Sequence, residues 1–258
     1  MIIDTHCHLN DMKLVYFVPD IVSTQKEDNM LAYICIGTDL KTSYLAKEEA
    51  KIFEPIYATI GYHPDYCREY NQEVEYKLKE YAKDEKVVAY GEIGLDYHGD
   101  FAPKEIQKMV FERQIHVANE LDLPLVIHIR DAFEDAINIL KANRDKINNG
   151  AVIHCFSGSV EIAKIFTDMG FYVSFNGVLT FKNAKKSVEV VKTLPIDKIL
   201  VETDSPYLSP EPYRGKLNEP KNVNIVVDKM AEILEIDRDE LEKILNQNAR
   251  NLFKKLKV

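Results

Sequence analysis

Short runs of apolar and β-branched residues recur along this chain, and a longer amphipathic segment follows each of them. The runs begin 31, 24, 31, 38, 26, 21 and 27 residues apart, close to the ~30 residues of a strand followed by a helix. Most of them are continuously apolar, which is typical of parallel strands that are buried on both faces. The eight runs are Met1–Ile3, Ala32–Ile36, Ile56–Ile60, Val87–Tyr90, Leu125–Ile129, Ala151–Ile153, Tyr172–Phe175 and Ile199–Val201. The pattern predicts an α/β fold.

The segments between the runs have helical periodicity. After Pro103, apolar residues follow i, i+3, i+4 spacing as far as Leu121, with charged residues on the opposite face. Similar patterns cover residues 136–140, 162–166, 222–234 and 239–255. Eight strands alternating with helices in 258 residues predict a single (β/α)8 TIM barrel domain over residues 1–258. An open doubly wound sheet is the alternative, but it usually has a glycine-rich phosphate loop after its first strand.

Composition narrows the class of protein. With 46% apolar and 29% charged residues the chain is typical of globular proteins. No run approaches the ~20 apolar residues of a membrane span, and the N-terminus lacks the pattern of a signal peptide. The four cysteines are scattered, as expected for reduced, mostly buried thiols in a cytoplasmic protein. A net charge of −9 argues against a broad basic face for nucleic acid, although metal ions can supply positive charge locally. No membrane association is predicted, and no protein partner can be inferred.

Histidines and carboxylates gather where the apolar runs end. They are His6 and His8 at the first run, His63 after the third, Glu92 after the fourth, His128 in the fifth, His154 after the sixth and Asp204 after the eighth. In a barrel the carboxyl ends of all strands meet at one mouth, where the βα loops build active sites. Core histidines that only satisfy local hydrogen bonds would not all lie at the same end of the strands. The sequence therefore predicts a functional site at the C-terminal mouth of the barrel.

The spacing of His6 and His8 indicates a metal site. Side chains two apart on a strand point the same way, so both imidazoles can reach one ion while Cys7 points into the layer between strand and helix. His128, His154, Glu92 and Asp204 are further candidate ligands. Together with His6 and His8 they are too many for one tetrahedral ion that keeps an open position. They suit two ions ~3.5–4 Å apart that share a carboxylate. Each carboxylate also has an interpretation without a metal: Glu92 as a solvated side chain in a loop, and Asp204 as the cap of a helix.

Six ordered motifs resemble the TatD family of metal-dependent deoxyribonucleases, within the amidohydrolase-like barrels, across essentially the whole chain. They are Asp4-Thr5-His6-Cys7-His8-Leu9, Gly61-Tyr62-His63-Pro64, Gly91-Glu92-Ile93-Gly94-Leu95-Asp96-Tyr97, His154-Cys155-Phe156-Ser157-Gly158, Glu202-Thr203-Asp204-Ser205-Pro206-Tyr207-Leu208 and Arg214-Gly215-Lys216-Leu217-Asn218-Glu219-Pro220. The chain departs from the family at Ile129, where Ser is common, and at Leu217, where Pro is frequent. Neither change alters a residue that the family uses as a metal ligand.

The resemblance implies a barrel with two divalent ions, Mg²⁺, Mn²⁺ or Zn²⁺. One ion would be held by His6, His8, Glu92 and Asp204, and the other by Glu92, His128 and His154. It also implies cleavage of phosphodiester bonds in DNA, in some members as a 3′-to-5′ exonuclease. We expect Asp204 and Glu92 to be the catalytic carboxylates, with Asp204 orienting and deprotonating the attacking water. Asp96, which follows Glu92 closely, is expected to matter less than Asp204.

Residues near the predicted mouth are weaker candidates for substrate contacts. His63 can touch a phosphate or hold its own turn, and Arg130 can bind a phosphate bidentately or pair with Asp131. Arg214 lies in the loop after the eighth strand, which often binds phosphate in barrels. Its side chain either binds phosphate or is simply solvated. Stacking on a base by Tyr97 and Phe156 is less favoured than packing under a loop. His98 and His116 are interpreted as structural.

Two other functions remain open at this point. The first is a hydrolase of another class on the same barrel, acting on an amide or ester such as that of an aminoacyl-tRNA. Many amidohydrolases bridge their metals with a carboxylated lysine after the fourth strand, where this chain has Glu92, which favours a phosphodiesterase. The second is a non-catalytic, metal-dependent binding protein.

Overall fold

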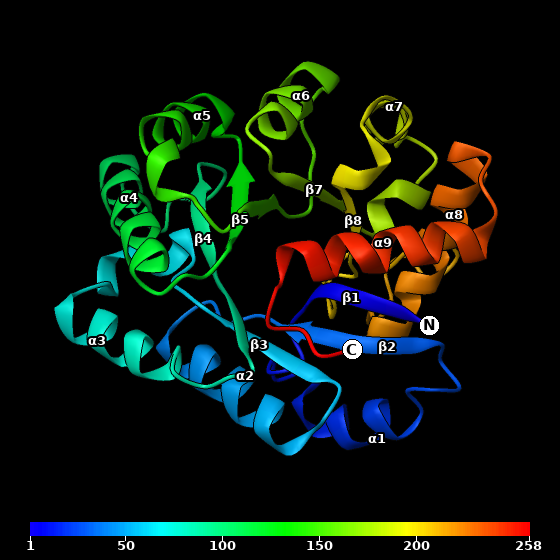
Figure 1. The fold of residues 1–258 in the computed structure, drawn as a ribbon, viewed down its shortest axis with the longest axis horizontal. Coiled ribbons are helices and arrows are strands. Elements are labelled where there is room, and N and C mark those ends of the chain that lie inside the picture. The colour runs from blue at the N-terminus through cyan, green and yellow to red at the C-terminus, as the bar shows by residue number, and fades with distance from the viewer.

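The computed structural model describes residues 1–258 as a ring of eight parallel strands surrounded by helices (Figure 1). The strands are hydrogen-bonded in chain order, so each strand lies beside its predecessor. They are β1 (Ile2–Cys7), β2 (Met30–Cys35), β3 (Ile56–Ile60), β4 (Val87–Asp96), β5 (Leu125–Arg130), β6 (Ala151–Ile153), β7 (Tyr172–Phe175) and β8 (Ile199–Val201). This architecture confirms the predicted (β/α)8 barrel.

The helices are α1 (Val18–Ser23), α2 (Leu40–Ile52), α3 (Gln72–Tyr81), α4 (Lys104–Glu120), α5 (Phe133–Ala142), α6 (Val160–Asp168), α7 (Lys185–Thr193), α8 (Val223–Leu234) and α9 (Arg238–Leu252). Five helices, α4, α5, α6, α8 and α9, lie where the apolar periodicity predicted them, and α1, α2, α3 and α7 were not located from the sequence. Figure 1 shows α2 to α8 around the outside of the strands, with α9 lying beside β1. None of these helices combines the length and the apolar character that a membrane crossing requires.

The barrel closes between β1 and the segment that follows β8. The backbone N–H of Asp204 donates to the carbonyl of His6 at 2.8 Å, and the N–H of His8 donates to the carbonyl of Ser205 at 2.7 Å. Both bonds involve residues that carry predicted site side chains. The closure of the fold therefore also brings the two ends of the predicted site together.

The interior of the barrel is packed with side chains rather than open. Ile3, Ile34, Val88, Val126 and Leu200 belong to one buried apolar cluster, which also includes Leu252 and Phe253 at the end of α9. On α9 the Asn248 amide donates to the carbonyls of Ile196 and Ile199, each at 2.8 Å. Helix α9 therefore covers the end of the barrel where the strands begin, opposite the mouth.

Strand β4 is longer than the apolar run that predicted it. We expected Glu92 to follow a strand ending at Tyr90, but β4 continues to Asp96, and Glu92 lies inside it. The extension is stabilised by pairing with β5, in which Gly94 lies opposite His128. Gly94 has φ +140°, and a Cβ atom there would lie 2.0 Å from the carbonyl oxygen of His128, so only glycine permits this approach. Glu92 is thus held on a paired strand rather than on a loop.

A buried carboxyl lies on helix α2, in the outer layer of the fold. Glu49 on α2 accepts a hydrogen bond at Oε2 from the Cys35 thiol at 3.4 Å, and its Oε1 has no partner. Burial raises the pKa of Glu49 from 4.5 to about 7, and the hydrogen bond from Cys35 only partly opposes this. The folded protein therefore binds the Glu49 proton more tightly than the unfolded chain does.

This raised pKa predicts a pH-dependent gain from Glu49→Gln. The stabilising contribution of the neutral carboxyl is complete below pH 4.5 and is lost as pH rises towards 7. The amide of the variant cannot ionise. As pH rises from 5 to 8, the free energy of unfolding of the variant should therefore increase by up to about 3 kcal/mol relative to that of the wild type. Urea unfolding of both proteins at the two pH values measures this difference. Glu48→Gln, at the neighbouring and partly exposed position on α2, is the control and should show no such gain as pH rises. An equal effect of Glu49→Gln at both pH values would contradict the prediction.

Candidate metal centre

The carboxyl ends of the strands surround a cavity of ≈ 470 Å³. It collects side chains from distant parts of the chain, most of which carry a nitrogen or oxygen that can face a ligand. The lining residues are His8, Asn10, Asp11, Thr38, Thr42, His63, Asp65, Tyr66, Glu92, Asp96, His128, Arg130, His154, Asp204 and Tyr207. His6 lies buried directly behind them, with its ring stacked on that of His154 at 3.9 Å between centroids.

One group of donor atoms forms where β1 meets the end of β8. The Nε2 atoms of His6 and His8 are 3.3 Å apart. Asp204 Oδ1 lies 3.6 Å from His6 Nε2 and 3.3 Å from His8 Nε2. Glu92 Oε2 lies 3.6 Å and 3.9 Å from the same two nitrogens. Two imidazoles and two carboxylates therefore converge on one point.

A second group shares Glu92 with the first. Its other oxygen, Oε1, lies 3.0 Å from His128 Nδ1 and 2.8 Å from His154 Nε2. These two nitrogens are 3.1 Å from each other. Glu92 therefore extends one oxygen towards each group, as a bridging carboxylate would.

The spacing of these atoms fits metal ions. Two nitrogens bound to one ion at about 2.1 Å each are roughly 3.0–3.4 Å apart for coordination angles between octahedral and tetrahedral. Both imidazole pairs, at 3.3 Å and 3.1 Å, lie in this range. The residues predicted from the sequence as metal ligands are thus brought together in two sets. The assignment of these residues as metal ligands is still a prediction, and the distances between their donor atoms agree with it.

The charge of Glu92 is stabilised by its neighbours. Burial by itself would raise the pKa of Glu92, but the surrounding imidazoles of His154, His63 and His128 outweigh burial and hold the pKa well below its usual value. For His6, burial lowers the pKa, and the nearby His154 lowers it further. At His128 and His154 burial opposes protonation, but the neighbouring carboxylates outweigh burial and raise the pKa of both rings. Because only a neutral imidazole binds a metal ion, a cation bound at these rings would displace protons.

The residues predicted to contact substrate do not all reach the cavity. His63 and Arg130 line it, and His63 Nε2 lies 3.6 Å from Glu92 Oε1. Arg214 does not line it. Instead its guanidinium lies 4.3 Å from the centre of the Phe181 ring, because the long loop after β8 turns this side chain onto Phe181. The expectation that Arg214 reaches the site is therefore not supported by the geometry.

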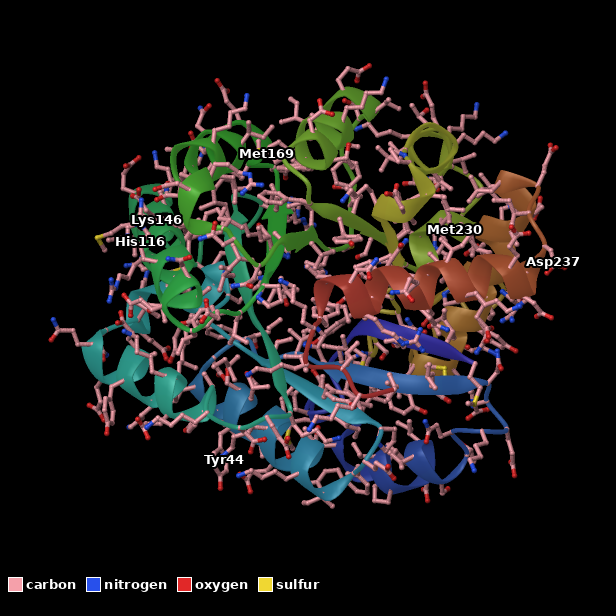
Figure 2. The ribbon with its side chains drawn as sticks, viewed as in Figure 1. Tyr44, His116, Lys146, Met169, Met230 and Asp237 are labelled. Atoms are coloured by element: carbon pink, nitrogen blue, oxygen red, sulfur yellow. The ribbon has the colours of Figure 1, made fainter.

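Three of the weaker aromatic and histidine candidates lie away from the cavity. Phe156 is buried against Phe133 and Phe166, and the Tyr97 hydroxyl donates to Asp135 at 2.6 Å. His116, labelled in Figure 2, lies on the outer helix α4 with its Nε2 3.0 Å from Asn143 Oδ1. These side chains pack or cap the fold rather than facing the cavity.

Sequence reasoning missed two carboxylates that lie behind the imidazoles. Asp96 Oδ2 is 2.9 Å from His128 Nε2, a contact that the sequence did not indicate. Burial opposes its ionisation, but the hydrogen bond from His128 prevails and lowers the pKa of Asp96 to about 2. Glu202 Oε1 lies 3.6 Å from His154 Nδ1 and accepts the N–H of Cys155 at 2.7 Å. The available signal was spacing: Glu202 lies two residues before Asp204, and Asp96 lies four residues after Glu92.

Comparison with known proteins agrees with this geometry. Residues 3–254 match the family model described as TatD related DNase. The uncharacterized metal-dependent hydrolase YabD of Bacillus subtilis is 44% identical over 254 residues, which covers 98% of this chain and 99% of that protein. The uncharacterized metal-dependent hydrolase YcfH of Escherichia coli is 34% identical over 259 residues, covering 98% and 95% of the two chains.

Solved structures show the same relationship. The crystal structure of the TatD homolog YjjV from Escherichia coli superposes with a TM-score of 0.92 at 28% identity, covering 98% of each chain. The organophosphorus hydrolase of Deinococcus radiodurans, at 12% identity and a TM-score of 0.66 over 98% of this chain and 92% of that one, shares the fold alone. The match over nearly the whole sequence, together with the high identity to YabD, shows that this chain belongs to the TatD family of metal-dependent hydrolases.

Proposed function

We propose that this chain is a deoxyribonuclease that cleaves phosphodiester bonds with the help of two divalent ions at the mouth of the barrel. The observation that carries the proposal is the position of Glu92, whose two oxygens face two separate pairs of imidazoles. Paired ions are a recurrent arrangement in nucleases and phosphatases. The description of the matching family model, TatD related DNase, supports DNA as the substrate.

The ligands are assigned from the two groups of donor atoms. His6, His8, Glu92 and Asp204 would hold one ion, and Glu92, His128 and His154 would hold the other. When bound, such ions lower the pKa of a water molecule and neutralise charge on phosphoryl oxygens. The mixture of imidazole and carboxylate is compatible with Mg²⁺, Mn²⁺ or Zn²⁺.

Asp204 is the residue that we assign as the general base. It lines the cavity, and its side chain is 14% exposed, so water can reach its carboxylate. The backbone at Asp204 has φ +57°, a conformation that aspartate tolerates better than most residues. The hydrogen bond from its N–H to the carbonyl of His6 holds it in place. From this position Asp204 orients the attacking water and accepts its proton.

His63 and Arg130 are assigned to the substrate phosphate. His63 Nδ1 accepts the backbone N–H of Asp65 at 3.2 Å, so the single proton of the neutral ring lies on Nε2, the atom nearer Glu92. His63 therefore donates a hydrogen bond into the cavity and does not offer a lone pair to an ion. Arg130 is exposed at the rim, where its guanidinium can bind phosphate oxygens bidentately.

The chemistry is proposed to take place in the cytoplasm. All four cysteines are free, and Cys7, Cys35 and Cys67 are buried, which suits a compartment that keeps thiols reduced. DNA is the only partner that we propose.

The first test is a substrate panel. Mn²⁺-loaded protein is incubated with single- and double-stranded DNA, RNA, an aryl ester, a cyclic amide and an aminoacyl-tRNA, and turnover is measured for each. We expect DNA to be cleaved with the highest kcat/KM, because β4 carries Glu92 and no lysine that could be carboxylated. Faster hydrolysis of the ester or the amide would assign the chain to another hydrolase class, and no turnover of any substrate would favour a binding protein.

The second test is metal content. Because the ligands form two sets, protein dialysed against Mn²⁺ should contain about two ions per chain. Chelation should abolish DNA cleavage, and added Mn²⁺ should restore it. Elemental analysis together with a chelator titration provides the measurement. Full activity in protein from which all metal has been removed would refute the two-ion proposal.

The third test is Asp204→Asn, which keeps the size of the side chain but removes its charge and its capacity to accept a proton. We expect kcat to fall by roughly 10²–10⁴, the usual contribution of a general base. The ion at His128 and His154 should remain bound, because Asp204 does not contact those residues. Asp11→Asn, which changes another carboxylate of the cavity wall, is the matched control and should cost much less. A near-normal kcat with both ions bound would mean that Asp204 is not the base.

A further inference from the structure

The two ring nitrogens of His128 face different surroundings. Nδ1 lies 3.0 Å from Glu92 Oε1 and 3.1 Å from His154 Nε2, in the second group of donor atoms. Nε2 lies on the other side of the ring, 2.9 Å from Asp96 Oδ2. A carboxylate on the far nitrogen of a metal-binding histidine is a common way to set which nitrogen carries the proton.

Asp96 is itself held in place before any ligand binds. Its Oδ1 accepts the backbone N–H of His98 at 2.8 Å. Its own N–H donates to Gln107 Oε1 at 2.9 Å, and its carbonyl accepts from Gln107 Nε2 at 2.8 Å. The residue is only 7% exposed. The carboxylate therefore has one oxygen bound to backbone and one oxygen left for His128.

The protonation of His128 follows from this arrangement. A carboxylate can only accept a hydrogen bond, so His128 must donate from Nε2. Nδ1 faces a second carboxylate, Glu92 Oε1, at 3.0 Å and can donate to it when no ion is bound. Because Asp96 keeps the proton on Nε2, only the lone pair of Nδ1 would be available to an ion at the second group. We propose that Asp96 is a positioning residue that holds His128 as the Nε2–H tautomer and thereby makes Nδ1 the metal-binding atom. This inference rests on the proposed two-ion function.

The other buried imidazoles of the site lack such a partner. The Nδ1 atoms of His6 and His154 have no hydrogen-bond partner, and Glu202 is 3.6 Å from His154 Nδ1. His63 is also held as the Nε2–H tautomer, because its Nδ1 accepts a backbone N–H, but its Nε2–H faces Glu92 in the site. Asp96 thus distinguishes His128 as a ligand from the adjacent His63 as a donor, although their ring centroids are only 4.5 Å apart.

Asp96→Asn tests the proposal because an amide has one acceptor and one donor end. If its oxygen accepts from the His98 N–H, its NH₂ group faces His128 Nε2 and favours the proton on Nδ1. If the amide is flipped, its NH₂ group faces the His98 N–H, and two donors oppose each other. In either orientation the asparagine cannot satisfy both partners that the carboxylate satisfies.

The first measurement is the tautomer of His128 in metal-free protein. Imidazole ¹H–¹⁵N correlation spectra of the ¹⁵N-labelled wild type, assigned by comparison with His128→Gln, should show the proton on Nε2. This measurement requires no folded Asp96 variant. A wild-type His128 that carries no proton on Nε2 overturns the proposal.

The second measurement is a calorimetric titration of metal-free protein with Mn²⁺. Asp96→Asn should weaken the second ion by roughly 10- to 100-fold and leave the first ion within about threefold of the wild type. Asp65→Asn is the matched control. It removes the same charge from the same cavity wall without touching a proposed ligand, and it should leave both ions within about threefold of the wild type. An unchanged second site in Asp96→Asn, or an equal loss in Asp65→Asn, overturns the role of Asp96. Neither measurement uses DNA, so a failure to cleave DNA would reject the proposed function without affecting this result.

Discussion

The buried carboxylate of Glu92 is the group on which the rest of the site depends. Removing an unpaired carboxylate from water costs several kcal/mol, and only well-placed partners compensate for this cost. Strands β1, β5 and β6 provide those partners as imidazoles, and β3 leads into His63. The strand order, the pairing of β4 with β5 and the closure between β1 and β8 together place these imidazoles around one carboxylate.

The cavity wall explains why a protein of this kind would need cations. Arg130 is the only arginine or lysine among the lining residues, whereas Asp11, Asp65, Glu92, Asp96 and Asp204 are all acidic. A phosphodiester would be repelled by such a wall. Bound divalent ions reverse the local charge and are often the largest charges in a site. The acidic composition and the proposed chemistry are therefore consistent with each other.

The residues that stabilise the fold and the residues of the predicted site lie at opposite ends of the barrel. At one end, α9 covers the apolar interior, and Asn248 satisfies carbonyls near the start of β8. At the other end, the strands carry the imidazoles and carboxylates of the cavity. Changes at the covered end are expected to affect folding, and changes at the mouth are expected to affect ligand binding, as is usual in this fold.

The sequence by itself determined the barrel and the residue types at its mouth, because apolar periodicity and strand-end position are local properties of the chain. Apolar runs located the strands, and the strand ends indicated His6, His8, His128 and Asp204. Only the tertiary structure decided which atoms meet. It placed Glu92 inside β4, put Asp96 behind His128 and turned Arg214 away onto Phe181. Such contacts depend on strand register and on the paths of loops, which are set by packing between segments that lie far apart in the sequence.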